Sequence, residues 1–224
     1  MDSDLRGLSP AVGWMRGYEA MRTILLATTN PGKLAELAAM LGVDVAWKNL
    51  TDFPDVQTVE EDGRTFAENA RKKALGYAAQ MGLWTLADDS GLVIDALDGA
   101  PGVQSARFCG AADARDRATI DRLNNARVLE LLADVPDEQR TARFMCCLCL
   151  AEPGKVLAES QGVFEGRILR QGRGENGFGY DPVFYVPDLG RTVAELSREQ
   201  KNAISHRARA VATMRPHLVR LLSG

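Results

Sequence analysis

Long apolar runs are missing from this 224-residue sequence, in which no segment approaches the roughly 20 apolar residues that span a bilayer. Residues 1–21 also hold no continuous apolar core of the kind found in signal peptides. A net charge of only −3 at pH 7 disfavours a nucleic-acid coat or a protein of the membrane surface. We therefore expect a cytoplasmic protein with neither nucleic acid nor membrane among its partners.

Cysteine and histidine, the usual zinc ligands, are scarce, with four and two residues respectively. Cys146, Cys147 and Cys149 share one apolar run of strand character, in which neighbouring side chains point to opposite faces. These thiols cannot readily converge on one metal ion, and no second cluster has ligand spacing. Together with Cys109 they are expected to be free, buried thiols without a chemical role, as in a reducing compartment.

Strand-like and helix-like segments alternate along the chain, which predicts an α/β fold. Residues 1–20 are expected to form an extension, and residues 21–224 a single domain. The predicted strands cover residues 23–27, 43–47, 84–87, 140–151 and 155–165, and the predicted helices cover residues 31–41, 65–81, 113–133 and 203–222. Glu152-Pro153-Gly154 is a turn signal between two long strands, so the sheet should contain an antiparallel pair and be mixed. Pro216 should kink or divide the last helix.

The first candidate site is a strand-to-helix turn, Thr28-Thr29-Asn30-Pro31-Gly32-Lys33. Backbone N–H groups at a helix N-terminus are unpaired and favour an anion, and the polar side chains of the turn add further donors. The P-loop pattern is absent. The turn fits a phosphate site, and it also fits an ordinary helix start capped by Thr or Asn.

Acidic residues gather in two places. Asp88-Asp89-Ser90-Gly91 follows an apolar strand, and Mg²⁺ would relieve the repulsion between adjacent carboxylates. The same residue types are frequent in a polar turn after a strand. Glu60-Glu61-Asp62-Gly63 precedes the 65–81 helix, and such a run is usually a solvated loop unless it folds near Asp89. Most polar residues of that helix are expected to be solvated: Glu68, Asn69, Arg71, Lys72 and Lys73.

Two further segments have ligand-binding character. Residues 172–182 contain four glycines, and Phe178, Tyr180 and Asp181 suit base stacking and hydrogen bonding, although a flexible loop whose aromatics return to the core is the alternative. Residues 201–207 contain Lys201, His206 and Arg207, a donor-rich corner for an oxygen-bearing ligand. The alternative there is a helix start capped by Ser205.

Together these motifs resemble the inosine triphosphate pyrophosphatase family, in particular its bacterial dITP/XTP pyrophosphatases. The segments that carry the resemblance are Thr28 to Glu36, Phe66 to Ala70, Ala87 to Leu92, Gly99 to Arg107, Gly177 to Phe184 and Ser205 to Arg207. The resemblance covers residues 22 to 222. It implies an elongated mixed β-sheet flanked by helices, with two lobes, a substrate cleft between them and a homodimer.

The resemblance also implies roles for individual residues. Asp89 is similar to the catalytic carboxylate and Mg²⁺ ligand, with Asp88 beside it. Glu60 matches a second metal ligand, with Glu61 as the alternative. The substrate-binding positions implied are Thr28, Thr29, Asn30, Pro31, Gly32, Lys33, Lys73, Ser90, Phe178, Gly179, Tyr180, Asp181, Lys201, His206 and Arg207. Thr29 departs from the family, which usually has Gly there.

The implied reaction is hydrolysis of dITP, ITP or XTP to the monophosphate and pyrophosphate. We expect Asp89 or Asp88 to take the proton of the attacking water, helped if crowding between the two carboxylates raises a pKa. Lys33 would receive the charge on pyrophosphate. Donors at Lys201, His206 or Arg207 would favour a 6-oxo purine over adenosine. A Maf-like nucleotide pyrophosphatase and a non-catalytic nucleotide-binding module are the alternatives.

Overall fold

The computed structural model describes residues 21–110 and 116–224, and the predicted extension at residues 1–20 lies outside this part of the chain. One seven-stranded sheet has the order β2-β1-β3-β4-β5-β6-β7. Its strands are β1 (Thr23–Leu26), β2 (Ala46–Asn49), β3 (Trp84–Ile94), β4 (Thr141–Glu152), β5 (Lys155–Ile168), β6 (Phe184–Val186) and β7 (Arg191–Thr192). Strand β1 runs parallel to β2 and β3, whereas all later neighbours are antiparallel. The predicted mixed sheet is confirmed.

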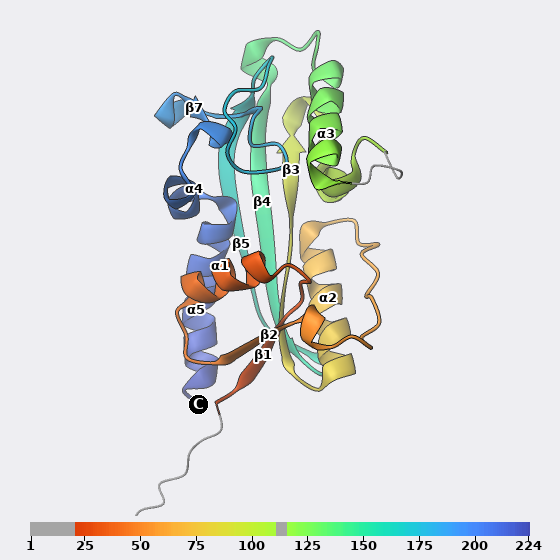
Figure 1. Ribbon diagram of the computed structural model, residues 1–224, viewed down its shortest axis with the longest axis vertical. Coiled ribbons are helices and arrows are strands. Elements are labelled where there is room, and N and C mark those ends of the chain that lie inside the picture. The colour runs from red at the N-terminus through yellow and green to blue at the C-terminus, as the bar shows by residue number, and fades with distance from the viewer. Residues whose placement is uncertain (1–20, 111–115) are drawn as a thin grey trace, which may run out of the picture.

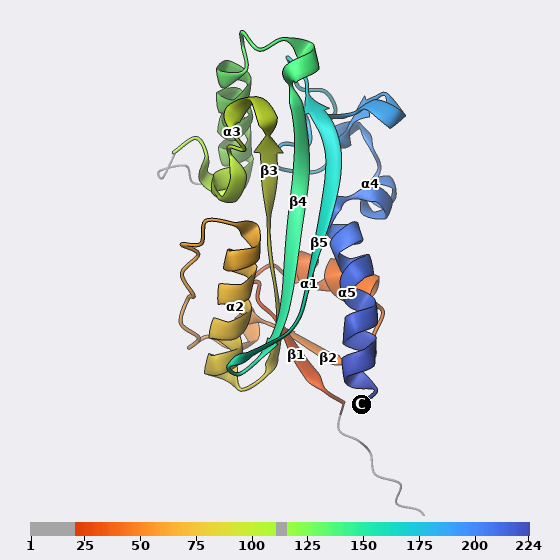
Figure 2. The ribbon, with the colours of Figure 1, turned by 180° about the vertical axis from the view of Figure 1, so that it is seen from behind.

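In the described ranges, five α-helices flank this sheet. They are α1 (Pro31–Leu41), α2 (Phe66–Met81), α3 (Arg117–Leu131), α4 (Arg198–Ile204) and α5 (His206–Leu222). The molecule is elongated along β3, β4 and β5, with α2 on one side and α1 and α5 on the other (Figures 1 and 2). Helix α3 lies beside the far end of β3, away from α2 (Figure 1). None of these helices is long and apolar enough to cross a membrane.

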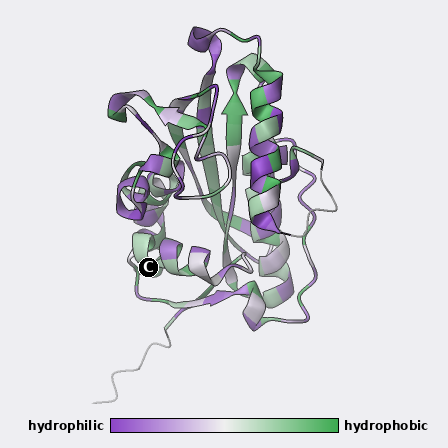
Figure 3. Ribbon diagram, turned by 45° about the horizontal axis from the view of Figure 1, so that its top comes forward, coloured by the Kyte–Doolittle hydropathy of each residue, from purple (hydrophilic) through white to green (hydrophobic). Residues whose placement is uncertain are grey.

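Apolar side chains fill both faces of the sheet. Leu37 of α1 and Met214 of α5 pack with β1 and β3 on one face. Ala74 and Tyr77 of α2 pack on the other face. A third cluster at the far end joins Val128 of α3 to β5 and β6. Each helix in Figure 3 shows both purple and green, as expected where only one side of a helix is buried.

Local signals define the predicted helix ends well. Asn30 caps α1, and Gly42 ends it with φ of 56°, a left-handed conformation that suits glycine. The last predicted helix, however, is divided at Ser205 rather than at Pro216, which lies inside α5. Ser205 has an extended backbone, and its hydroxyl accepts a hydrogen bond from the N–H of Ala208 at 3.2 Å. The break is at Ser205 because that residue can cap the new helix.

Strand β3 is longer than predicted, because Asp88-Asp89-Ser90-Gly91 lies within it rather than in a turn after it. Residues 85–94 pair with β4 in an unbroken antiparallel register. Gly91 permits a close approach, since a Cβ there would lie 2.3 Å from Oγ of Ser105. That oxygen accepts a hydrogen bond from the N–H of Leu92 at 2.9 Å. Pairing with β4 therefore outweighs the local turn preference of these residues.

Smaller differences concern the second strand and the thiols. Strand β2 begins at Ala46, whereas residues 43–47 were predicted, because its register with β1 starts at Thr23 opposite Ala46. The four cysteines are free, as predicted. Those in β4 are buried, whereas Cys109 is only half-buried.

Candidate active site

The turn between β1 and α1 is a capped helix start that begins with Pro31 as the first helical residue. The Asn30 side chain accepts hydrogen bonds from the N–H of Gly32 at 2.9 Å and of Lys33 at 3.2 Å. The Thr28 hydroxyl accepts one from the N–H of Asn30 at 3.1 Å. The cap therefore satisfies two N–H groups that we expected to be unpaired. Side chains remain for an anion, among them the exposed Thr29.

Lys33 joins this turn to the acidic strand. Its ammonium lies 2.6 Å from Oδ1 of Asp88 in β3. The side chain of Lys33 comes from the first turn of α1, and Asp88 lies just beyond the level at which β1 ends. The structure thus places the turn and the acidic strand next to each other, as the sequence interpretation required.

Asp88 and Asp89 face opposite sides of the sheet, because consecutive residues of a strand alternate. Asp88 is 2% exposed and shares its face with Ser90. Burial alone would raise the pKa of Asp88, but Lys33, Arg207 and Lys73 outweigh it and lower that pKa to about 2. Asp88 is therefore a carboxylate anion at neutral pH and a weak proton acceptor, and its role as the catalytic base stays a prediction.

Asp89 has the opposite electrostatic environment on the α2 side. Burial raises its pKa, Lys73 and Asn69 partly offset this rise, and Glu61 adds to it. The expected crowding between Asp88 and Asp89 is therefore not the cause, since Glu61 is the carboxylate that acts on Asp89. A raised pKa suits a group that takes a proton from water.

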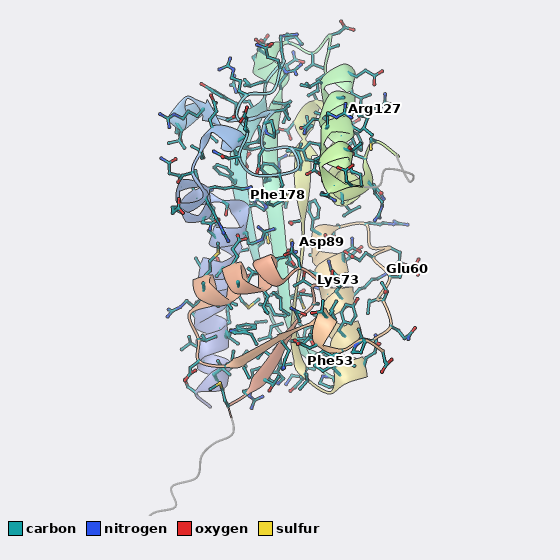
Figure 4. The ribbon with its side chains drawn as sticks, in the orientation of Figure 1. Phe53, Glu60, Lys73, Asp89, Arg127 and Phe178 are labelled. Carbon is teal, nitrogen blue, oxygen red and sulfur yellow. The ribbon has the colours of Figure 1, made fainter. Side chains whose placement is uncertain are left out.

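Glu61, rather than Glu60, is the acidic residue next to this centre. The Glu61 carboxylate lies 2.7 Å from Nζ of Lys73, whose charge also acts on Asp89. Glu60 is exposed, and its side chain lies on the outer side of the loop, away from Asp89 (Figure 4). The alternative, Glu61, is therefore the acidic residue that contacts Lys73, and the match of Glu60 to a metal ligand stays a prediction.

Asn69 is a site residue that the sequence interpretation missed. It is 2% exposed, although polar residues of this helix were expected to be mostly solvated. Its Nδ2 donates to Oδ2 of Asp89 at 3.0 Å, and its Oδ1 accepts from the N–H of Gly63 at 2.7 Å. Asn69 therefore ties the acidic loop to Asp89. Its position on the apolar side of the helix, beside Phe66 and Ala70, was the available signal.

The start of α5 places two buried donors near Asp88. Arg207 is 7% exposed, and its Nη1 lies 3.4 Å from Oε1 of Glu36. Burial, Arg207 and Lys201 lower the pKa of His206 to about 3, so its ring is neutral at pH 7. Within the described residues, Nδ1 of His206 and Nε of Arg207 have no hydrogen-bond partner. These two residues keep unused polar atoms that a ligand can meet.

The glycine-rich loop presents Phe178 to solvent, 58% exposed. Nζ of Lys201, from α4, lies 4.2 Å from the ring centroid of Phe178. Lys201 also forms an ion pair with the buried Asp181, whose Oδ2 accepts from the N–H of Phe178 at 2.9 Å. Phe178, which is labelled in Figure 4, is therefore an available stacking surface, and the ammonium of Lys201 lies beside it.

Tyr180 does not share this role. It is 4% exposed, and its hydroxyl donates to the backbone oxygen of Ser105 at 2.9 Å. The suggested stacking face at Tyr180 is therefore wrong, because the residue is part of the core at the end of α3. Gly179 has φ of 62°, and both its N–H and its carbonyl are bound by α3 through Asp121 and Asn125, which the sequence interpretation also missed.

Charge connects the two ends of the site. The charge of Arg207 helps to lower the pKa of Asp88, near the turn, and it partly offsets the burial that raises the pKa of Asp181, in the glycine-rich loop. Arg207 thus acts on a carboxylate at each end of the predicted site. In the part of the chain that the structure describes, no three His, Cys, Asp or Glu side chains gather closely enough to hold a metal ion unaided.

The sequence of this chain matches one known protein family. The Ham1 family matches residues 24–217, most of the chain and every candidate residue. The chain belongs to the Ham1 family. This agrees with the resemblance seen in the motifs and does not favour the Maf-like or non-catalytic alternatives.

Ham1 relatives cover nearly the whole of this chain. A dITP/XTP pyrophosphatase of Geobacter sulfurreducens is 52% identical over 88% of this chain and 97% of its own. Another, of Pseudomonas aeruginosa, is 48% identical over 88% of this chain and 98% of its own. A HAM1 protein of Coxiella burnetii has a similar structure, with a TM-score of 0.81 and 44% identity over 89% of this chain and 100% of its own.

Proposed function

We propose that this Ham1 protein hydrolyses the non-canonical purine nucleoside triphosphates dITP, ITP and XTP to the monophosphate and pyrophosphate. The names of its relatives support this substrate class. The observation that carries the proposal is the contact of Lys33 with Asp88, which brings a cationic turn against a strand with the raised-pKa carboxylate Asp89. A triphosphate bound at Lys33 would have its reacting phosphorus close to that carboxylate.

A divalent cation, which we propose to be Mg²⁺, fits the donors present. Mg²⁺ usually binds one or two protein carboxylates together with substrate phosphates and water, so a complete cage of protein ligands is not needed. Asp89 and Glu61 are the carboxylates that would hold it. Both face the α2 side, and a cation there would relieve the repulsion by which Glu61 raises the pKa of Asp89. Bound Mg²⁺ would supply charge neutralisation of the phosphates.

The remaining chemistry belongs to side chains. Asp89 would accept the proton of the attacking water on its carboxylate, which Asn69 orients through Nδ2. Lys33 and Lys73 would stabilise negative charge that develops on the departing pyrophosphate. Asp88 would hold Lys33 in place, since it is a buried anion in direct contact with it.

Selectivity for the base would arise at the other end of the site. Phe178 offers a face for stacking, and Lys201 lies beside it. His206 and Arg207 have unused polar atoms. Arg207 can donate to a 6-oxo group, whereas an amino group at that place would leave the buried donor unpaired, at about 1–3 kcal/mol per unpaired group. A 6-oxo purine is thereby favoured over adenosine.

Pyrophosphate release with ITP, XTP, dITP, GTP and ATP, with and without Mg²⁺, tests this function. We expect turnover of the first three at rates well above those for ATP, and only with the metal. Equal rates for ATP and ITP, or release of orthophosphate in place of pyrophosphate, would contradict the assignment.

Glu61 and Glu60 form a matched pair for the metal proposal. Glu61→Gln should weaken Mn²⁺ binding, followed by electron paramagnetic resonance, by roughly tenfold or more, because one of two charged ligands is lost. Glu60→Gln should bind Mn²⁺ as the wild type does. The reverse result would restore Glu60 as the ligand.

We further propose that residues 21–224 form a single domain with the substrate cleft between two lobes, and that the protein is a cytoplasmic homodimer. Light scattering of the purified protein at several concentrations would measure the oligomeric state. A mass of one chain, 24.4 kDa, at every concentration would exclude the dimer.

A further inference from the structure

The backbone of the glycine-rich loop is held from outside the loop. Gly177 and Gly179 have φ of 79° and 62°, and glycine gives a chain little stiffness of its own. The exposed ring of Phe178 lies between them. The Phe178 ring can stack on a base at a defined position only if the backbone on both sides of it is fixed. The contacts that fix this backbone therefore also fix the ring.

Helix α3 binds both polar groups of Gly179. Oδ2 of Asp121 accepts from the N–H of Gly179 at 2.7 Å. Nδ2 of Asn125, one helical turn later, donates to the carbonyl of Gly179 at 2.8 Å and to the carbonyl of Asp121 at 2.9 Å. The two side chains thus hold the peptide groups on both sides of Gly179.

A second carboxylate holds the preceding residue. The N–H of Phe178 donates to the buried Asp181, which Lys201 of α4 also binds. Two successive N–H groups, of Phe178 and Gly179, are therefore received by carboxylates from different parts of the fold. Asp121 is 8% exposed and forms an ion pair with Arg117 at 2.9 Å, which holds its carboxylate in place.

We propose that Asp121 and Asn125 are positioning residues that set the place of the Phe178 ring, and thereby the affinity for the nucleoside. This inference rests on the proposed function of the site. The two residues contact neither Lys33 nor Asp89, which lie on other elements. They affect the affinity for the base and do not affect hydrolysis of the phosphates.

Asn125→Ala removes the hydrogen bond to the carbonyl of Gly179. Because Asn125 is only half-buried, the variant should fold. We expect KM for ITP to rise roughly tenfold, the effect of one hydrogen bond, with kcat within about twofold of the wild type. Inhibition by inorganic pyrophosphate, which needs only the phosphate end, should be unchanged. The preference for ITP over ATP should fall, because the base is held less firmly.

Asp121 supplies an independent series. Asp121→Ala should resemble Asn125→Ala, whereas Asp121→Asn keeps an oxygen acceptor for the N–H of Gly179 and should restore most of the affinity. Arg127→Ala is the matched control, because Arg127 lies on the same helix and, among the described residues, pairs only with Glu130, at 2.8 Å on the surface. It should behave as the wild type.

An unchanged KM in Asn125→Ala would overturn the inference. A loss of kcat together with weaker pyrophosphate inhibition would also overturn it, since that pattern indicates general damage to the site. If the wild type released no pyrophosphate, the proposed function would fail. Calorimetric binding of ITP to the same variants would then still test whether α3 sets nucleoside affinity.

Discussion

The two faces of strand β3 differ in chemistry at a single dipeptide. On one face, Asp88 is buried beside Lys33 of α1 and near Arg207 of α5, and its pKa falls to about 2. On the other face, Asp89 lies near Glu61 and its pKa rises. The residues are neighbours with the same side chain. Strand alternation alone gives one of them the role of a fixed anion and the other the role of a proton acceptor.

The two aspartates show that binding neighbouring cations and accepting a proton require different surroundings. A carboxylate surrounded by cations organises those cations but accepts a proton poorly, whereas a carboxylate with a raised pKa is a better base and a weaker stabiliser. Two substitutions of the same kind, Asp88→Asn and Asp89→Asn, should therefore fail in different ways. That difference can be measured.

Asp89→Asn should have the largest effect. It removes the proposed proton acceptor and one of the two carboxylates that we propose to hold the metal, so kcat for ITP should fall about 10²–10⁴-fold. Circular dichroism should show an unchanged fold. Asp134→Asn, at an exposed position remote from the site, is the control and should keep full activity. Wild-type turnover in Asp89→Asn would remove the distinction between the two faces.

Asp88→Asn should cost stability. Its Oδ1 pairs with Lys33 at 2.6 Å, so the change leaves partly buried cations without their counter-charge, at about 3 kcal/mol of unfolding free energy. Asp89→Asn should be neutral or stabilising, because a raised pKa in the folded state means that the charged form is disfavoured there. Urea denaturation of both variants at pH 7 measures the contrast. Equal losses would contradict it.

His206 provides the smallest and most specific prediction, on the face of Asp88. Its pKa is about 3 in the folded chain, against an ordinary value of 6.5. Between these values the unfolded chain binds a proton that the folded chain does not, so stability falls as pH falls. From pH 7 to pH 5 this group should cost about 2 kcal/mol. His206→Gln should show a pH dependence smaller by that amount in urea denaturation at the two pH values, and an unchanged dependence would contradict the neutral ring.

Much of the fold could be predicted because its signals are local. Helix α1 has proline at its start and glycine after its end, and residues 31–41 were predicted correctly. The β4–β5 hairpin follows from Glu152-Pro153-Gly154. Strand β3 beyond Ala87 could not be predicted, because its extension depends on pairing with β4, about 50 to 60 residues away in the sequence. The short strands β6 and β7, of three and two residues, have no periodicity to detect.

The candidate site shows the same division. The Asn30 turn, Asp88-Asp89 and Phe178 were all found from residue types and order. The choice of Glu61 over Glu60 was left open, since it depends on how a loop folds back onto α2. Three further residues were missed for a related reason, Asn69, Asp121 and Asn125. Each binds a backbone or carboxylate group that is distant in the sequence, and a polar side chain on a helix is expected to be solvated unless the fold buries it.

The close contact of Gly91 with Ser105 has a consequence for insertions and deletions. A slip of β3 by one residue against β4 would exchange the sides on which positions 88 and 89 point, and with them the two electrostatic environments. Ser105 opposes such a slip. Its hydroxyl oxygen lies against Gly91, where a Cβ would clash, and accepts a hydrogen bond from the N–H of the next residue, Leu92. A single-codon deletion upstream in β3 would thus misplace both carboxylates at once, whereas a substitution at position 88 or 89 alters only one.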